Sequence, residues 1–303
     1  LMVMPRAAGL FGRAIAQSVP GTFFSAALAA DIAAALTAEL GLRPDAAALA
    51  AVTPARLVEA AESATARMRG HEERWGAVAH TVTPFSPVVD GDVLPRDPWS
   101  ALAAGAGRGI ELIAGHNRDE YRLFTATGRL GRTRAGEPLR VFAPGLEQGY
   151  RDAYPAAHAE SLDELAQSDW VFRMPSLRLA DAHAAGGGRA HTYELTWPSP
   201  VMDGALGACH GLDVPLVFGN LDSGMGRFLL GEGAAPEAAA VSADFRRAWT
   251  GFAAGDGPGW EPYEPGARLT RLFDVRPSVV PYPEEASRRL WATHTFGELP
   301  LLD

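Results

Sequence analysis

Two residues of this chain have types and surroundings that suit acid–base chemistry. His210 has glycine three residues before it and directly after it, in the segment GACHG. Glycine lets the backbone aim the histidine ring and leaves room for a substrate beside it. A histidine base works best when a carboxylate accepts the hydrogen bond from its Nδ1, and we expect Glu120 in that role. The pair predicts a general base held in one orientation by an acid.

Such a pair serves a nucleophile, which in many hydrolases is a serine on a turn written G-x-S-x-G. The sequence has no such turn, because Ser223 is followed by Gly224 but has no glycine two residues before it. Cys209 is adjacent to His210, and neighbouring side chains usually point apart, so we discount it as the nucleophile. We expect the other seven histidines to be satisfied core or surface residues: His71, His80, His116, His158, His183, His191 and His294.

The position of Glu120 depends on the element before it. The apolar run 110–114 predicts a buried strand, and the polar residues 116–120 predict a loop at its carboxyl end. Loops at the carboxyl ends of parallel strands present side chains to a crevice. On the local sequence alone, a solvated strand–helix loop explains these charges equally simply. The need of His210 for a carboxylate favours Glu120 as a site residue, and we expect its charged neighbours to be surface residues: His116, Arg118 and Asp119.

The rest of the chain predicts a single α/β domain over residues 1–303. A strand at 88–89, a helix from Pro98 and the strand at 110–114 suggest a βαβ unit and hence a parallel sheet. No linker is long or polar enough to mark a domain boundary. Further elements are expected as a helix from Ser25 to Leu40, a strand at 190–197, a helix at 242–254, a last strand at 268–273 and a terminal helix at 283–293.

Composition excludes several classes of protein. The formal net charge is −9 over 303 residues, which argues against a nucleic-acid partner, because phosphate binding needs clustered positive charge. A single cysteine, Cys209, rules out a disulfide framework within the chain and argues against thiolate metal sites. The first residues do not form a signal peptide, and no apolar run reaches the roughly 18 residues of a membrane span. We expect a cytoplasmic protein without a membrane partner.

Four motifs in order resemble the later half of a type-B carboxylesterase, the family of para-nitrobenzyl esterases and, more distantly, cholinesterases. They are FSPVVDGDVLP, GHNRDEYRLF, GACHGLDVPLVFG and AWTGFAAGDGPGW, and the opening MPRAAGLFGRAIAQSVP matches as well. The resemblance covers essentially the whole chain. It implies the C-terminal part of an α/β-hydrolase fold, with a mostly parallel central sheet flanked by helices, and no metal or organic cofactor.

The same resemblance assigns residues. Glu120 corresponds to the triad acid, His210 to the triad base, and Ser18 to a serine that supports the site from behind with a hydrogen bond. The family usually has glycine where this chain has Tyr121, so we expect an altered gorge around an unchanged acid. Apolar substrate contacts are expected from three residues: Phe23, Phe24 and Leu212.

The family's first half carries the oxyanion-hole glycines and the nucleophile elbow, and neither is in this sequence. The resemblance therefore implies an esterase acting on small-molecule esters, with its serine upstream of Leu1, and an isolated chain that is inactive. We expect the missing N-terminal portion as a partner. Two other interpretations stay open, namely a non-catalytic binding or adhesion protein on the same fold and one subunit of a split esterase.

Overall fold

The structure is a computed structural model, and it describes residues 1–128, 134–233 and 235–303. Its main sheet has the strand order β1-β4-β5-β6-β7. The first four strands run parallel to one another, and β7 is antiparallel to β6. The expected mostly parallel sheet is thus confirmed. The strands are β1 (Arg13–Gln17), β4 (Glu111–Asn117), β5 (Ala190–Leu195), β6 (Leu269–Phe273) and β7 (Ser278–Pro281).

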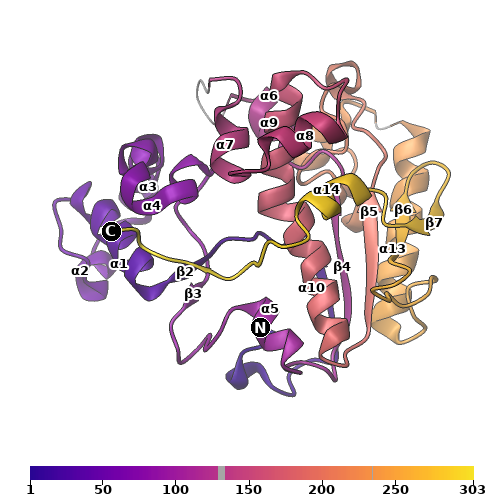
Figure 1. Cartoon of the computed structure of the whole chain (residues 1–303), viewed down its shortest axis with the longest axis horizontal. Helices are drawn as coiled ribbons and strands as arrows, with labels where there is room; N and C mark the ends of the chain where they lie inside the picture. Colours follow the sequence, from indigo (N-terminus) through magenta and orange to yellow (C-terminus); the bar gives the residue numbers. More distant parts are fainter. Residues whose placement is uncertain (129–133, 234) are drawn as a thin grey trace.

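Side chains that alternate along β4 build a core on each face of this sheet. Leu112 and Ala114 pack into a cluster with residues of α10 (Met174–Ala185), whereas Ile113 packs into a cluster with residues of α13 (Pro236–Ala254). The sheet therefore lies between these two helices (Figure 1). Glycine is required at position 115 of β4, since a Cβ there would lie 2.3 Å from the carbonyl oxygen of Tyr193 in β5.

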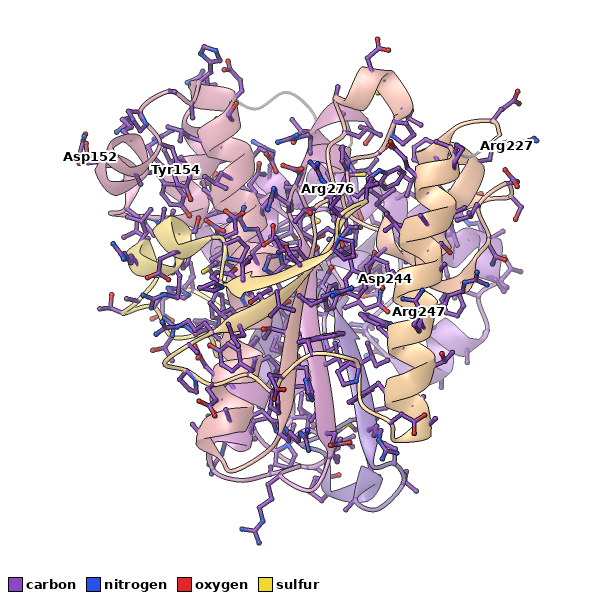
Figure 2. All side chains as sticks on the ribbon, turned by 90° about the vertical axis from the view of Figure 1, so that its right-hand side faces the viewer. Asp152, Tyr154, Arg227, Asp244, Arg247 and Arg276 are labelled. Carbon is purple, nitrogen blue, oxygen red and sulfur yellow. The ribbon has the colours of Figure 1, made fainter. Side chains whose placement is uncertain are left out.

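The helix α13 is also tied to the sheet by charge. Arg271 of β6 donates to Asp244 of α13 at 2.7 Å, and Arg247 pairs with the same aspartate at 2.9 Å. Figure 2 shows α13 with Asp244 and Arg247 on one flank of the sheet, and β7 crossing in front. This helix begins at Pro236, six residues earlier than the sequence indicated.

Short helices gather at the carboxyl ends of β4 and β5 (Figure 1). They form a layer at this end of the sheet (Figure 1). This layer consists of α6 (Arg122–Ala126), α7 (Glu137–Phe142), α8 (Glu147–Ala153), α9 (Ala159–Ser168), the π-helical turn η4 (Asp169–Arg173), α11 (Asp213–Phe218), α12 (Met225–Leu230) and α14 (Glu285–Leu290).

A second, smaller sheet has the order β3-β2-β8 and joins distant parts of the chain. Its strands are β2 (Phe23–Ser25), β3 (Val88–Val89) and β8 (Glu298–Leu299), and α1 (Ala26–Ala38), α2 (Ala46–Ala50), α3 (Pro54–Arg67) and α4 (Glu72–Trp75) lie beside it (Figure 1). Ser25 caps α1 as predicted, by accepting from the amide of Leu28.

Three expectations about the elements were wrong. Because β3 belongs to the smaller sheet, the segment β3, α5 (Pro98–Ala103) and β4 is not a βαβ unit of one sheet. The strand β4 continues to Asn117, so the polar cluster starts inside the strand. Two further strands, β7 and β8, follow the strand that was expected to be the last. In the described part of the chain, no helix combines the length and apolar character that crossing a bilayer requires.

Candidate active site

The structure brings His210 and Glu120 into direct contact. The Nδ1 of His210 lies 2.6 Å from Oε2 of Glu120, and the amide of His210 donates to the Glu120 carbonyl at 3.2 Å. Glu120 is fully buried, whereas the His210 side chain keeps 33% of its surface exposed. With Nδ1 bound to the carboxylate, the imidazole is left with Nε2 as the nitrogen that can exchange a proton with another molecule.

The second carboxylate oxygen of Glu120, Oε1, accepts two further hydrogen bonds. Ser18 donates its hydroxyl to Oε1 at 2.5 Å, and the amide of Asn117 donates to the same oxygen at 2.7 Å. Ser18 directly follows β1, and its own amide donates to the carbonyl of Gly115 in β4. Residues at the ends of the neighbouring strands β1 and β4 therefore fix the carboxylate in position. Ser18, the residue expected to support the site, is in direct contact with it.

The contact changes the pKa of both partners. Burial alone lowers the pKa of His210, but the negative charge of Glu120 and its hydrogen bond outweigh burial and raise it above the ordinary value. For Glu120, burial favours the neutral form. The charge of His210 and the hydrogen bonds from His210, Ser18 and Asn117 nevertheless hold the pKa below its usual range. The two shifts favour a carboxylate that stays ionised beside an imidazole that binds protons more readily.

Two aromatic rings cover the imidazole. Phe172, from the π-helical turn η4, stacks on His210 with ring centroids 4.4 Å apart and an angle of 23° between the planes. Phe124 of α6 approaches it at 5.4 Å. An aromatic residue in an apolar helical segment is ordinarily a core residue, so the sequence does not single out Phe172 or Phe124. Nothing in their spacing from His210 points to these contacts.

A second carboxylate, Asp213, lies behind the pair. Its carboxylate accepts hydrogen bonds from the side-chain amide of Gln17 at 2.5 Å and from the side-chain amide of Asn117 at 3.3 Å. The indole N–H of Trp249 in α13 donates to the side-chain oxygen of Gln17 at 3.0 Å. Burial and the charge of Glu120 raise the pKa of Asp213. Its place three residues after His210 is the signal that could have marked it.

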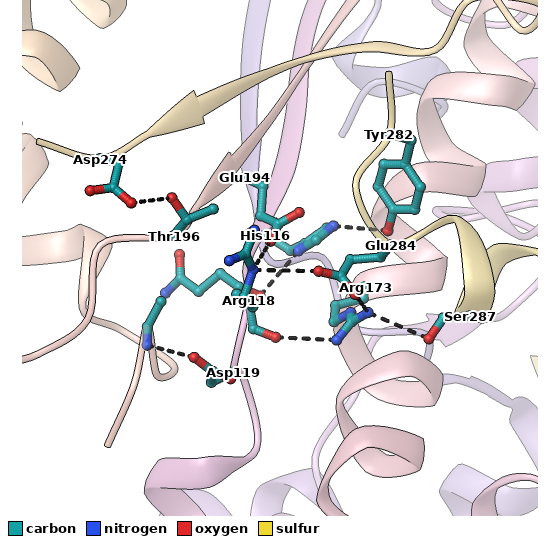
Figure 3. Close-up of polar contacts among 12 residues, drawn as sticks. His116, Arg118, Asp119, Arg173, Glu194, Thr196, Asp274, Tyr282, Glu284 and Ser287 are labelled. Carbon is teal, nitrogen blue, oxygen red and sulfur yellow. Dashed lines mark hydrogen bonds and ion pairs between the residues drawn. The ribbon is translucent and has the colours of Figure 1, made fainter. Parts of the chain in front are cut away.

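The neighbours of Glu120 were predicted to be surface residues. This was wrong for His116, whereas Arg118 and Asp119 are partly exposed. His116 is buried, with Nε2 3.1 Å from the Tyr282 hydroxyl, and burial lowers its pKa to about 4. Arg118 is half-exposed and pairs with Glu194 at 2.7 Å (Figure 3). Asp119 accepts from the amide of Ala208 at 2.8 Å. Because β4 runs on to Asn117, the side chain of His116 lies in the core at the end of the strand and not in a solvated loop.

The residues expected to contact substrate lie in three different places. Phe23 lines a cavity of about 570 Å³ and packs edge-on against Trp99. Phe24 belongs to the apolar cluster beneath α1, and Leu212 is fully buried in the cluster on the α13 side of the main sheet. Tyr121 is buried against Phe124.

Burial makes Cys209 unreactive, because it raises the pKa of the thiol to about 12. In the part of the chain that the structure describes, no three His, Cys, Asp or Glu side chains form a group that could hold a metal ion. The expectation of chemistry without a metal or an organic cofactor stays a prediction.

Ser18 has the left-handed backbone conformation, with φ of 50°, which non-glycine residues rarely adopt. The Ser18→Ala and Ser18→Gly variants lose the same hydrogen bond to Glu120, but only glycine relieves the backbone. We expect Ser18→Gly to be more stable than Ser18→Ala by about 1 kcal/mol, measured by urea denaturation. An alanine variant at least as stable as the glycine variant would show that the backbone at Ser18 is not strained.

The chain is similar to known proteins of one family. The model of the carboxylesterase family matches residues 1–266. The para-nitrobenzyl esterase of Bacillus subtilis (strain 168) is 29% identical over 300 residues, which is 95% of this chain and 58% of that protein. The phenmedipham hydrolase of Pseudarthrobacter oxydans is 28% identical over 190 residues, which is 55% of this chain and 34% of that protein.

Solved structures extend the likeness to the fold. The carboxylesterase EST55 of Geobacillus stearothermophilus, solved at pH 6.2, superposes with a TM-score of 0.76 at 28% identity, covering 96% of this chain and 60% of that one. A PNB esterase structure gives 0.75 at 28% identity, covering 95% and 59%. The fold is therefore of the α/β-hydrolase type, and the chain spans about three fifths of the length of these relatives. With most of its length matched by the family model, this chain belongs to the carboxylesterase family.

Proposed function

We propose that this chain supplies the acid and the base of a serine carboxylic-ester hydrolase. The observation that carries the proposal is the 2.6 Å contact between Nδ1 of His210 and Oε2 of the fully buried Glu120. The nucleophile is a serine outside these 303 residues, since the sequence has no G-x-S-x-G turn. Ser18 is a supporting residue, because its hydroxyl is already given to Glu120.

In this mechanism the Nε2 of His210 takes the proton of the serine hydroxyl as the serine oxygen attacks the ester carbonyl. Glu120 stabilises the imidazolium that forms. The imidazolium then gives the proton to the departing alcohol, and an acyl-enzyme remains. Water attacks the acyl group while His210 takes a proton from it, and return of that proton to the serine releases the acid. The net reaction consumes one ester and one water and yields one alcohol and one acid.

The proposed substrate is a small-molecule ester with apolar groups. The proposed contacts are the two rings that lie against His210, Phe124 and Phe172. Of the three residues expected from the resemblance, only Phe23 lines a cavity, whereas Phe24 and Leu212 are buried in separate apolar clusters. Rings beside the base suit an ester, because binding sites for small molecules are mostly apolar with a few polar groups that fix orientation. The two relatives found by sequence are named for the hydrolysis of para-nitrobenzyl esters and of phenmedipham.

The proposed partner is polypeptide that corresponds to the part of the relatives beyond the match. Among the described strands, β1 is hydrogen-bonded only to β4, so its other edge offers unpaired backbone groups. The cavity of about 570 Å³ runs beside this edge and is lined by Ala14, Ile15 and Ala16 of β1. A strand added at this edge would continue the parallel sheet and would bring its carboxyl end towards the site.

We propose a cytoplasmic location for the chain. Its single cysteine is a free and buried thiol, which suits a reducing compartment. Fractionation of the source cells with an antibody to this chain would test it.

The function is tested by comparing the 303-residue chain with the complete product of the open reading frame that encodes it. We expect no measurable hydrolysis of para-nitrophenyl esters by the chain alone, because loss of a nucleophile costs several powers of ten in rate. The complete product should hydrolyse them, and its His210→Ala variant should not. Rapid, His210-dependent hydrolysis by the chain alone would place a nucleophile within it. An inert complete product would refute the hydrolase proposal and favour a binding protein.

A further inference from the structure

The π-helical turn η4 interrupts the path from α9 to α10 directly beside His210. Such turns are rare and are found mainly at functional sites, where they redirect side chains. Here the turn presents Phe172 to the imidazole and directs the next residue, Arg173, into the protein, where its side chain is only 2% exposed. An arginine is almost never buried to this extent unless it is fully paired.

The guanidinium of Arg173 joins three segments (Figure 3). Its Nη1 donates to the carbonyl of Arg118 at 3.3 Å, and its Nη2 donates to Glu284 at 2.6 Å. Its Nε lies 3.0 Å from a carboxylate oxygen of Asp169, at the start of the same turn. The end of β4, the turn η4 and the residue before α14 are therefore held by one planar group. A rigid fork of donors is suited to such a task, and a lysine is not.

These contacts reach the candidate site by two routes. Arg118 lies two residues before Glu120, so the carbonyl that Arg173 binds belongs to the segment that carries the acid. Phe172 precedes Arg173, so the same anchor fixes the ring that covers the base. Neither route requires Arg173 to touch the reacting atoms.

We propose that Arg173 is a positioning residue, which holds the Glu120 segment and the Phe172 ring in register with His210. The inference rests on the proposed function for its meaning, but its test does not depend on ester hydrolysis. Nothing in the assignment of Glu120, His210 and Ser18 requires this role for Arg173.

The direction of the pKa change of His210 separates positioning from direct electrostatics. The charged groups that act on His210 are Glu120 and Asp213, and both favour its protonated form. Removing a nearby positive charge can only make protonation easier and raise the pKa. Loss of alignment between Nδ1 and the Glu120 carboxylate would instead weaken the interaction that raises it, so the pKa would fall.

The test is an NMR titration of the imidazole Cε1–H of His210 in the 303-residue chain, with the signal assigned from its absence in His210→Asn. In Arg173→Met we expect the pKa of His210 to fall by about 0.5 to 1. The matched control is Arg178→Met on α10. It removes an ion pair to Asp181 and two bonds to the carbonyls of Trp291 and Ala292, and should leave His210 unchanged.

An unchanged or raised pKa of His210 in folded Arg173→Met would overturn the proposal, and so would an equal fall in Arg178→Met. If Arg173→Met does not fold, Glu284→Gln removes one partner of the guanidinium and should give a smaller fall in the same direction. An unchanged pKa in that variant would overturn the proposal as well. An inert complete gene product together with a fall in Arg173→Met would instead refute the hydrolase function and leave the positioning role standing.

Discussion

Replacing Glu120 with Gln in the complete gene product is expected to lower kcat for para-nitrophenyl ester hydrolysis by about 10⁴-fold. Ser18 and the amide of Asn117 both donate to Oε1, so the oxygen of the new amide will occupy that position. The amide nitrogen must then face Nδ1 of His210, where it can only donate. His210 would carry its proton on Nε2, the nitrogen that accepts the proton of the serine in the proposed mechanism.

The pH dependence of kcat/KM provides a second measurement on the same variant. A base is active when it is unprotonated, so the acid limb of the profile follows the pKa of His210. In the native protein the charge of Glu120 raises that pKa, and in Glu120→Gln the acid limb should move to lower pH. The matched control is Asp119→Asn, which alters the neighbouring carboxylate but not the contact with His210. Equal losses of kcat in the two variants would contradict the role of Glu120.

Removing the carboxylate of Asp169 is expected to destabilise the fold by about 3–5 kcal/mol, because the buried guanidinium of Arg173 then loses one of the two carboxylates paired with it. The other, Glu284, is shared with Arg118. Asp169 is fully buried and also accepts the hydroxyl of Tyr150 at 2.7 Å. That hydroxyl in turn accepts from Trp291 at 2.6 Å. The measurement is the free energy of unfolding of Asp169→Ala in urea.

Two variants test whether the incompletely paired positive charge of Arg173 causes the loss of stability in Asp169→Ala. Glu59→Ala breaks an exposed pair with Arg56 and should change the free energy of unfolding by at most about 1 kcal/mol. The double variant Asp169→Ala/Arg173→Met removes the stranded cation as well, and should be more stable than Asp169→Ala alone. A double variant that is less stable by the sum of both single changes would show that the two side chains act independently.

The residues that could be assigned from the sequence are those whose position follows from local chemistry. Leu28 and Ile32 lie four residues apart and are both buried in α1, and Ser25 caps that helix as its type predicts. The run before Glu120 has the apolar character of a buried strand, which places the acid near a strand end. His210 stands out through the glycines around it. The partnership of these two residues is expected because a histidine base needs a carboxylate partner, and the resemblance assigns them the same roles.

The parts that could not be predicted depend on pairings between distant segments. Val88 and Val89 read as a strand, but nothing local tells which sheet they join, and they pair with β2. His116 looks like a surface residue because its partner, Tyr282, is far along the chain. Phe172 reads as a core residue, since a π-helical turn has no sequence pattern of its own. Burial of charge at Arg173 likewise depends on partners that only the tertiary structure brings together.

The separations along the chain within the candidate site have a consequence for folding. Ser18 and Glu120 are 102 residues apart, and Glu120 and His210 are 90 apart. Contacts of this range are slow to form, because the entropy of closing long loops is lost before the contacts repay it. The hydrogen bond between Glu120 and His210 should therefore be among the last features to appear when the chain refolds. In an NMR spectrum, the signal of the proton between Nδ1 of His210 and Oε2 of Glu120 would then report complete assembly of the fold, and not only formation of its helices.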